Sequence, residues 1–268
     1  MQRILVALDG SPLSEEVIPY AAAVARQVVA KLDFLRVIDE EKEPLAAAEA
    51  YVAAVAGRCH ATGRVVTAGN TIQTILDDMN AAPGTLLALT THGRSGITEE
   101  VFGSVALNIV RHAGQPVLLY RPAQPGAGDK DVTISTVVAP LDGSEFAERI
   151  LPHATDFAKS LGAELQLVQV IPETVGAAWR AVSGDVQESS YVHSQARLIA
   201  RSGVRTSWEV LHGDPARAIA AYIGSRRDVI LAMTSHARAG LSKTLFGSVM
   251  SGCLRTAGVP VFVYHPPE

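Results

Sequence analysis

The sequence predicts an α/β protein made of two tandem domains, each built on a five-stranded, doubly wound parallel sheet. Its 268 residues, 48% of them hydrophobic, are enough for about two domains of roughly 150 residues each. Short motifs recur in the same order in both halves, and short apolar runs alternate with helical segments in each half. That alternation is typical of parallel sheets with helices on both faces.

The recurring motifs indicate a duplication. Residues 8–11 (LDGS) recur as 141–144, 133 positions later, and residues 102–105 (FGSV) recur as 246–249, 144 positions later. The second half therefore has 11 more residues in its middle. Residues 123–131 between the halves are polar and rich in turn formers, as in a linker. We expect the domains to span 1–122 and 132–268.

Each half alternates strand and helix. Residues 4–8 form a continuous apolar run, which suits a strand buried on both faces. Ser11 is the predicted N-cap of a helix that has Pro12 at its first position and runs to about Lys31. The later strands of the first half are expected at 32–37, 65–68, 86–90 and 117–120, and its later helices over 45–61, 71–80 (capped by Asn70 or Thr71) and 104–112.

The second half repeats the pattern, and Asp214 followed by Pro215 predicts the start of its third helix. Its strands are expected near 135–141, 164–170, 205–210, 228–233 and 260–264. With the strand order 3-2-1-4-5, the loops after strands one and four of each half face each other across one crevice. In open parallel sheets, ligands bind at that point, beyond the carboxyl ends of the strands.

Composition excludes several function classes. A formal charge of −4 and a pI near 6.1 leave no basic excess for nucleic-acid binding. No apolar run approaches the 18 or so residues of a membrane span, and the short apolar run at the N-terminus does not predict a signal peptide. Two cysteines make neither a disulfide framework nor a Cys-rich zinc site, and Cys253 is expected to be packed. We expect a cytoplasmic protein.

The loop after the fourth strand carries the chemistry. Gly103 allows close approach to the backbone, and Ser104 is predicted to cap a helix whose free N–H groups and dipole favour an anion such as phosphate. Alternatively, this Gly-Ser segment only ends the loop and caps the helix, and binds no ligand. The sequence has neither a G-x-x-x-x-G-K-[ST] motif nor a G-x-G-x-x-G motif after a first strand, which argues against P-loop NTPases and ordinary dinucleotide dehydrogenases.

Taken together, these motifs resemble the universal stress protein family in a tandem arrangement. The resemblance is carried by residues 6–11, 92–96, 103–105 and 116–120, with 139–144, 236–249 and 260–264 in the second half. It implies the Rossmann-like fold of the adenine nucleotide alpha hydrolase type and a role in stress response through nucleotide-dependent changes of shape or partner. It also implies an ATP ligand, commonly with Mg²⁺, and slow hydrolysis at most.

The resemblance assigns a nucleotide site to each half. Asp9 and Asp142 would meet the ribose or adenine, although an Asp-Gly turn alone also explains them. Val37 and Val170 would form an apolar wall for the adenine. The full set of nucleotide-binding candidates is Ala7, Leu8, Asp9, Val37, Thr90, Gly93, Arg94, Gly103, Ser104, Val105, Pro140, Leu141, Asp142, Val170, Thr234, Gly247, Ser248 and Val249.

Nucleotide-binding members of the family carry the pattern G-x2-G-x9-G-[ST], from which both halves depart. Thr90 replaces the first glycine in the first half, and Thr234 and Ala237 replace both upstream glycines in the second. Threonine does not readily adopt positive φ and adds a Cβ where a phosphate approaches, whereas its hydroxyl can bond a phosphate. On this reasoning the first half is the better nucleotide site, and the second is weak or empty.

Two other functions stay open. The chain can be a non-nucleotide-binding interaction module of the same fold, in which these substitutions record a lost site. A more distant alternative is an adenylate-forming enzyme. The apolar last strands at 116–120 and 260–264 need a partner, so we expect the two domains to pair with each other and two chains to form a homodimer.

Overall fold

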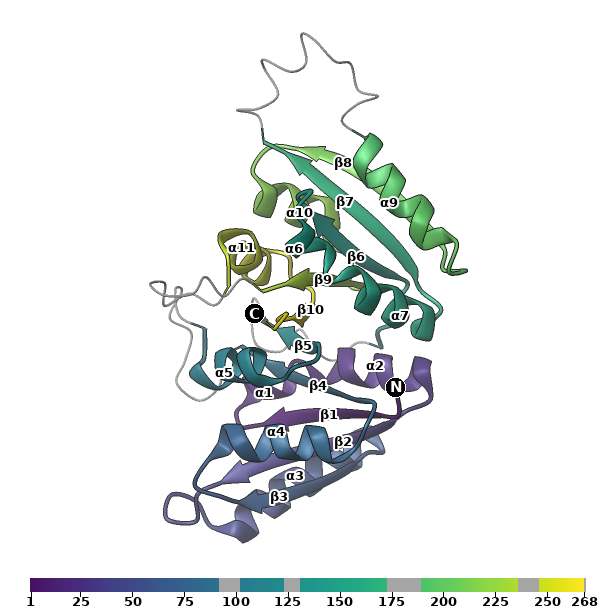
Figure 1. The fold of residues 1–268 in the computed structure, drawn as a ribbon. Coiled ribbons are helices and arrows are strands. Elements are labelled where there is room, and N and C mark those ends of the chain that lie inside the picture. The colour runs from purple at the N-terminus through teal and green to yellow at the C-terminus, as the bar shows by residue number, and fades with distance from the viewer. Residues whose placement is uncertain (92–101, 123–130, 173–188, 236–245, 268) are drawn as a thin grey trace. The chain divides into compact units, whose positions relative to one another are not determined.

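The computed structural model describes residues 1–91, 102–122, 131–172, 189–235 and 246–267. The chain divides into two compact units, Met1–Thr133 and Ile134–Glu268. Each unit is an α/β layer structure with helices on both faces of a parallel sheet (Figure 1). The predicted fold class is therefore confirmed.

The first unit alternates strands and helices from its first residues. Its strands are β1 (Arg3–Leu8), β2 (Lys31–Ile38), β3 (Thr62–Thr67), β4 (Thr85–Thr90) and β5 (Val117–Tyr120). Its helices are α1 (Pro12–Glu15), α2 (Ile18–Val28), α3 (Leu45–Cys59), α4 (Thr71–Ala81) and α5 (Ser104–His112).

The second unit repeats this order. Its strands are β6 (Thr136–Leu141), β7 (Glu164–Ile171), β8 (Thr206–His212), β9 (Val229–Thr234) and β10 (Val261–Tyr264). Its described helices are α6 (Glu145–Glu148), α7 (Leu151–Leu161), α9 (Ser190–Ala200), α10 (Pro215–Ile223) and α11 (Ser248–Thr256).

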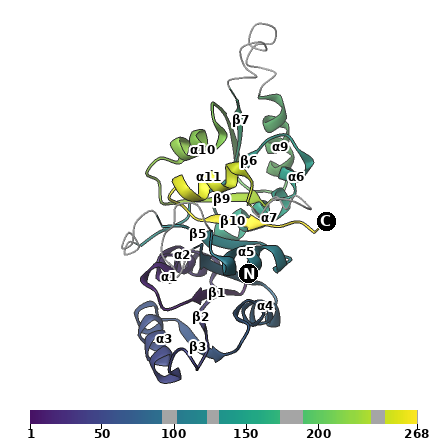
Figure 2. The ribbon, with the colours of Figure 1, turned by 90° about the vertical axis from the view of Figure 1, so that its left-hand side faces the viewer.

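The strand order within the first unit is β3-β2-β1-β4-β5, and within the second it is β8-β7-β6-β9-β10. Both are the predicted 3-2-1-4-5 order, with parallel pairing. The chain first moves outward from the central strand and then crosses to its other side. Right-handed crossovers consequently place α2 and α3 on one face and α4 and α5 on the other (Figure 2).

The sheet supplies the core of each unit. All six residues of β4 and all four of β5 are buried, as expected for strands covered by helices on both faces. Tyr20 and Phe34 are among the largest fully buried side chains. Rigid strands packed in this way fix the positions of the loops that leave their carboxyl ends.

Several predicted boundaries were wrong in detail. The helix expected from Pro12 to about Lys31 is divided into α1 and α2, because Pro19 in the first turn of α2 has no N–H to continue the helix, and Lys31 already begins β2. Strand β3 begins at Thr62 rather than Val65. The predicted caps Ser11, Asn70 and Asp214 are confirmed, since each side chain accepts a backbone N–H bond. Of the predicted linker, only Asp131 lies within the described residues.

Candidate functional site

Each unit has a cavity at the carboxyl ends of its strands, where strand order reverses. The first cavity measures about 410 Å³ and lies among the ends of β1, β2 and β4 and the start of α5. The second measures about 470 Å³ and lies among the corresponding ends of β6, β7 and β9 and the start of α11. Both volumes fall in the range of about 300–1,000 Å³ that small-molecule sites occupy.

The structure brings the predicted site residues together in these two cavities. Those lining the first cavity are Ala7, Leu8, Asp9, Val37, Thr90, Gly103, Ser104 and Val105. Those lining the second are Pro140, Leu141, Asp142, Val170, Thr234, Gly247, Ser248 and Val249. Gly93 and Arg94 lie outside the described residues.

Asp9 and Asp142 each form a tight turn at the edge of a cavity. The Asp9 carboxylate accepts hydrogen bonds from the Ser11 backbone N–H at 2.9 Å and from its hydroxyl at 2.6 Å. Asp142 accepts the same pair of bonds from Ser144 at 3.0 and 2.6 Å. Each aspartate can therefore both form an Asp-Gly turn and face a ligand, because the turn holds its carboxylate beside the cavity.

The second strand of each unit continues past its central neighbour. The β1–β2 ladder ends with Leu8 opposite Arg36, while β2 runs on through Val37 beside β3. The β6–β7 ladder ends likewise, with Val170 beyond it. A valine side chain and a stretch of backbone polar groups therefore lie next to the cavity, where a flat heterocycle can pack and hydrogen-bond.

The helix starting at each cavity presents its N-terminus to it. Gly103 and Gly247 are the N-caps, and neither helix has a side-chain capping bond. The expectation that Ser104 caps the helix was wrong: Ser104 is the first helical residue, because Gly103 N–H bonds the Thr91 carbonyl at 2.7 Å and fixes the turn one residue earlier. The first N–H groups of such a helix point outward and favour an anion.

The substituted threonines do not strain the backbone. Thr90 and Thr234 are the last residues of β4 and β9, and extended backbone suits a β-branched side chain. The expected conformational penalty at these two positions was therefore wrong, while Ala237 lies outside the described residues. Thr90 and Thr234 occupy equivalent positions, so the predicted ranking of the first half above the second rests on Ala237 and stays a prediction.

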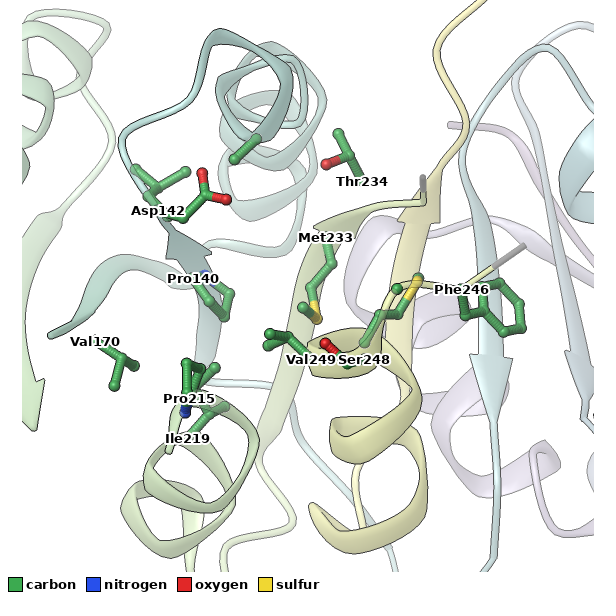
Figure 3. A pocket seen from close by; sticks show the side chains of 14 residues that line it. Pro140, Asp142, Val170, Pro215, Ile219, Met233, Thr234, Phe246, Ser248 and Val249 are labelled. Carbon is green, nitrogen blue, oxygen red and sulfur yellow. The ribbon is translucent and has the colours of Figure 1, made fainter. Parts of the chain in front are cut away.

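Figure 3 shows how the second cavity is walled. Asp142 and Thr234 lie on one side of it, and Ser248 and Val249 lie at the start of α11 on the other (Figure 3). The sequence prediction missed the contribution of α10, which supplies Pro215 and Ile219, and of Met233 at the end of β9. An apolar face on α10, whose Ile219 and Ile223 are buried, is the signal that was available.

The prediction also missed Arg36 and Glu43 in the first cavity. Arg36 is one of the few buried charged residues, and its guanidinium contacts the Glu43 carboxylate at 2.7–2.8 Å. A charged residue inside an apolar strand is rare unless it is paired. The arginine in the run 34–38 (FLRVI) was therefore the signal that could have found this pair.

Outside the cavities, Cys253 is fully buried, and burial raises the pKa of its thiol to about 12. This confirms its expected role as a packed residue, because a thiol of such pKa is protonated at neutral pH. Within the described segments, no group of three or more His, Cys, Asp or Glu side chains is arranged to hold a metal ion. The same segments contain no helix long and apolar enough to span a bilayer.

Comparison with known proteins places the chain in a family. The model of the universal stress protein family matches residues 1–61, 40–121 and 133–265. The chain belongs to the universal stress protein family. A universal stress protein of Methanocaldococcus jannaschii is 26% identical over 49% of this chain and 82% of its own length. One of Mycobacterium tuberculosis is 29% identical over 72% of this chain and 65% of its own length.

Solved structures agree on the fold over almost the whole chain. A universal stress protein of Archaeoglobus fulgidus superposes with a TM-score of 0.66, covering 99% of this chain and 98% of its own at 18% identity. A functionally unknown protein of Pseudomonas aeruginosa also has a TM-score of 0.66, with 99% and 93% coverage and 19% identity. The tandem arrangement of two such domains is therefore shared with solved proteins.

Proposed function

We propose that this universal stress protein binds adenine nucleotide, ATP in preference, in its carboxyl-end cavities. We further propose that it acts in stress response through nucleotide-dependent changes of shape or partner. The observation that carries the proposal is the order of groups around each cavity. Around each cavity lie, in order, a carboxylate held by a turn, an apolar wall at the end of the second strand, and the N-terminus of a nine-residue helix.

These three elements match the three parts of a nucleotide. A carboxylate accepts hydrogen bonds from ribose hydroxyls, as acidic residues do in dinucleotide sites. The valine wall suits the face of adenine, and the helix N-terminus suits the phosphates. Bound ATP commonly brings Mg²⁺, which would supply positive charge beside the phosphates and needs only one or two protein ligands. In this chain Asp9 or Asp142 and the hydroxyls of Ser104 or Ser248 are the groups that would hold the sugar and phosphates.

The proposal is tested by titrating the chain with ATP and Mg²⁺ in a calorimeter. The test variant is the double substitution Ser104→Glu and Ser248→Glu, which puts a negative charge at the first position of each helix. An acidic residue there stabilises a helix, so the fold is retained while phosphates are repelled. The matched control is Ser190→Glu, the same change at the exposed first position of α9, outside both cavities.

We expect the wild-type chain and Ser190→Glu to bind ATP and the double variant to lose binding. Adenine nucleotide released on denaturing freshly purified protein would support the same conclusion. No heat from the wild-type chain at millimolar ATP with Mg²⁺, and no released nucleotide, would contradict the proposal. That outcome would favour the interaction module. Pairing of the two domains, homodimer formation and cytoplasmic location remain predictions.

A further inference from the structure

The two cavities differ at one structurally equivalent position. Arg36 lies opposite Leu8 at the end of the β1–β2 ladder, and Gln169 lies opposite Leu141 at the end of the β6–β7 ladder. Arg36 lines the first cavity, whereas Gln169 does not line the second. The duplicated halves thus place a cation beside one cavity and a neutral amide at the same register position in the other.

Arg36 is held in place from several sides. Its side chain is 4% exposed, and it pairs with Glu43, which is 19% exposed. Its Nη2 also donates to the Asp9 carbonyl at 3.4 Å, and the guanidinium lies 4.7 Å from the centre of the Tyr51 ring. A paired, stacked guanidinium of this kind is costly to move, because displacing it breaks a mostly buried ion pair and the contact with the Tyr51 ring.

The guanidinium fills space that no described residue of the second unit fills. A Cβ built on Gly10 would collide with the terminal atoms of Arg36, while a Cβ on Gly143, the equivalent residue, meets no described atom within 4 Å. Both glycines have the same conformation, with φ of +84° and +82°. The region over the turn that follows Asp9 is therefore occupied by the guanidinium, whereas no described residue occupies the region over the turn that follows Asp142.

The linings differ in the same sense. Five charged residues line the first cavity: Asp9, Arg36, Asp39, Lys42 and Glu43. Of the charged residues that the structure describes, Asp142 alone lines the second, and the segment that follows β7 at 173–188 lies outside the described residues. Apolar side chains line both cavities at equivalent positions, Ile75 and Leu89 in the first and Ile219 and Met233 in the second. The Glu43 carboxylate is the part of the pair that still meets water, with 19% of its side chain exposed. An adenine base packed against it would remove that water without replacing its hydrogen bonds, which costs free energy.

Resting on the proposed nucleotide function, we propose that the Arg36–Glu43 pair is a specificity determinant that disfavours adenine nucleotide in the first cavity. The second cavity is then the tighter site, and the chain binds one ATP tightly and the other weakly. This reverses the ranking predicted from the glycine pattern. The helix N-termini and aspartate turns are equivalent in both units, so the difference arises at the nucleoside end of the site.

The test separates the two cavities within the full chain. Ser104→Glu blocks the phosphate end of the first cavity, and Ser248→Glu blocks that of the second. Into Ser248→Glu we add the double change Arg36→Gln and Glu43→Gln, which copies Gln169 at the Arg36 position and leaves no unpaired charge behind. Binding of ATP with Mg²⁺ is measured by calorimetry for each variant, and circular dichroism confirms that each is folded.

We expect Ser104→Glu to keep the affinity of the tight wild-type site and Ser248→Glu to lose it. The added double change should tighten the remaining site of Ser248→Glu by about tenfold, or about 1.4 kcal/mol. Equal affinities in the two single variants, or a first-cavity affinity that stays the same or falls when the pair is removed, would overturn the inference while the proposed function stands. Absence of ATP binding in the wild-type chain would instead overturn the proposed function.

Discussion

The first and second cavities have the same backbone arrangement in two duplicated domains, but the side chains that line them differ. Both have an aspartate turn, a valine beyond the central ladder and a helix N-terminus in the same order. The first has the Arg36–Glu43 ion pair, and the second has the neutral Gln169 at the register position of Arg36. Ile75 of α4 and Ile219 of α10 line the two cavities at equivalent places. Strand order and turns fix where the cavities lie, and under the proposed function a few side chains at the rim set how tightly each cavity binds nucleotide. The predictions below test how far this difference extends.

The largest expected effect comes from breaking the ion pair. Arg36→Gln alone should destabilise the first unit by about 3 kcal/mol, because it breaks the ion pair between Arg36 and Glu43 in a mostly buried site. Urea unfolding of the full chain, followed by hydrogen exchange to locate the loss, measures this. Adding Glu43→Gln should recover most of the stability.

The control for that prediction is Arg58→Gln. Arg58 pairs with Glu15, but its side chain is 63% exposed, so its loss should cost less than about 1 kcal/mol. Equal costs for Arg36→Gln and Arg58→Gln would show that the Arg36–Glu43 pair is not held as the structure indicates.

A smaller loss of stability is expected from disturbing the contact between α10 and α11. A Cβ added at Gly252 would collide with the Ala216 side chain, so Gly252→Ala should force the two helices apart at a cost of about 1–3 kcal/mol. The same shift moves Pro215 and Ile219, which line the second cavity, and should weaken ATP binding there. Thermal unfolding and calorimetry measure the two effects.

The first unit offers a matched variant, since Asn108 occupies the equivalent position of α5. Asn108→Ala should change stability by well under about 1 kcal/mol, because this side chain is only partly buried and bonds the Ser104 carbonyl of its own helix. Partial rescue of Gly252→Ala by Ala216→Gly would confirm the contact. A Gly252→Ala variant as stable as wild type would contradict it.

A third difference lies at the other end of the sheets. Arg226 and Ser135 hydrogen-bond the Asp228 carboxylate and lower its pKa to about 2, whereas Gly84 has the corresponding place before β4. Asp228→Asn should cost under about 1 kcal/mol at pH 7, because the pair is more than a third exposed. The pKa is lowered, so this contribution is present above pH 4 and is lost as pH falls toward 2. Unfolding free energies measured from pH 7 to pH 2.5 should show the wild type and variant converging.

The smallest expected effect is a difference in acid sensitivity. His153 packs against Tyr264 with ring centres 4.1 Å apart, where Tyr20 packs against Tyr120 in the first unit. Burial lowers the pKa of His153, so the unfolded chain takes up a proton at a higher pH than the folded one. Stability of the second unit should therefore fall as pH drops below about 6.5. The variant His153→Tyr should remove this dependence, as followed by melting temperature between pH 7.5 and 5.

The fold was predictable because each local signal agreed with the others. Apolar runs, the caps Ser11 and Asp214 and the repeated motifs all indicate the same architecture, and the strand order follows. The described candidate residues could be placed at the cavities because the duplicated motifs mark most of them twice, while Val37 and Val170 came from the family resemblance. The sequence could not show which side chains line the cavities from helices and strands that lie outside the repeated motifs.

Arg36 and Gly252 illustrate that limit. The importance of Arg36 depends on Glu43 and on the space over Gly10, and these meet only in the folded unit. Gly252 matters because Ala216 of another helix lies against it. At Thr90 and Thr234 the sequence instead predicted a feature that the structure lacks. The family pattern suggested backbone strain there, but both residues are in ordinary strand conformation. Local chemistry therefore predicted which residues gather at each cavity, whereas nucleotide binding and the ranking of the two cavities stay predictions.

A crystal structure of the wild-type chain grown with ATP and Mg²⁺ at a concentration that fills one site tests the central claim most directly. The account predicts nucleotide in the second cavity, with its ribose at Asp142 and its phosphates at Ser248, and Arg36 still paired with Glu43 in the first. Nucleotide in the first cavity alone would contradict the proposed role of the Arg36–Glu43 pair. Nucleotide in neither cavity would contradict the proposed function.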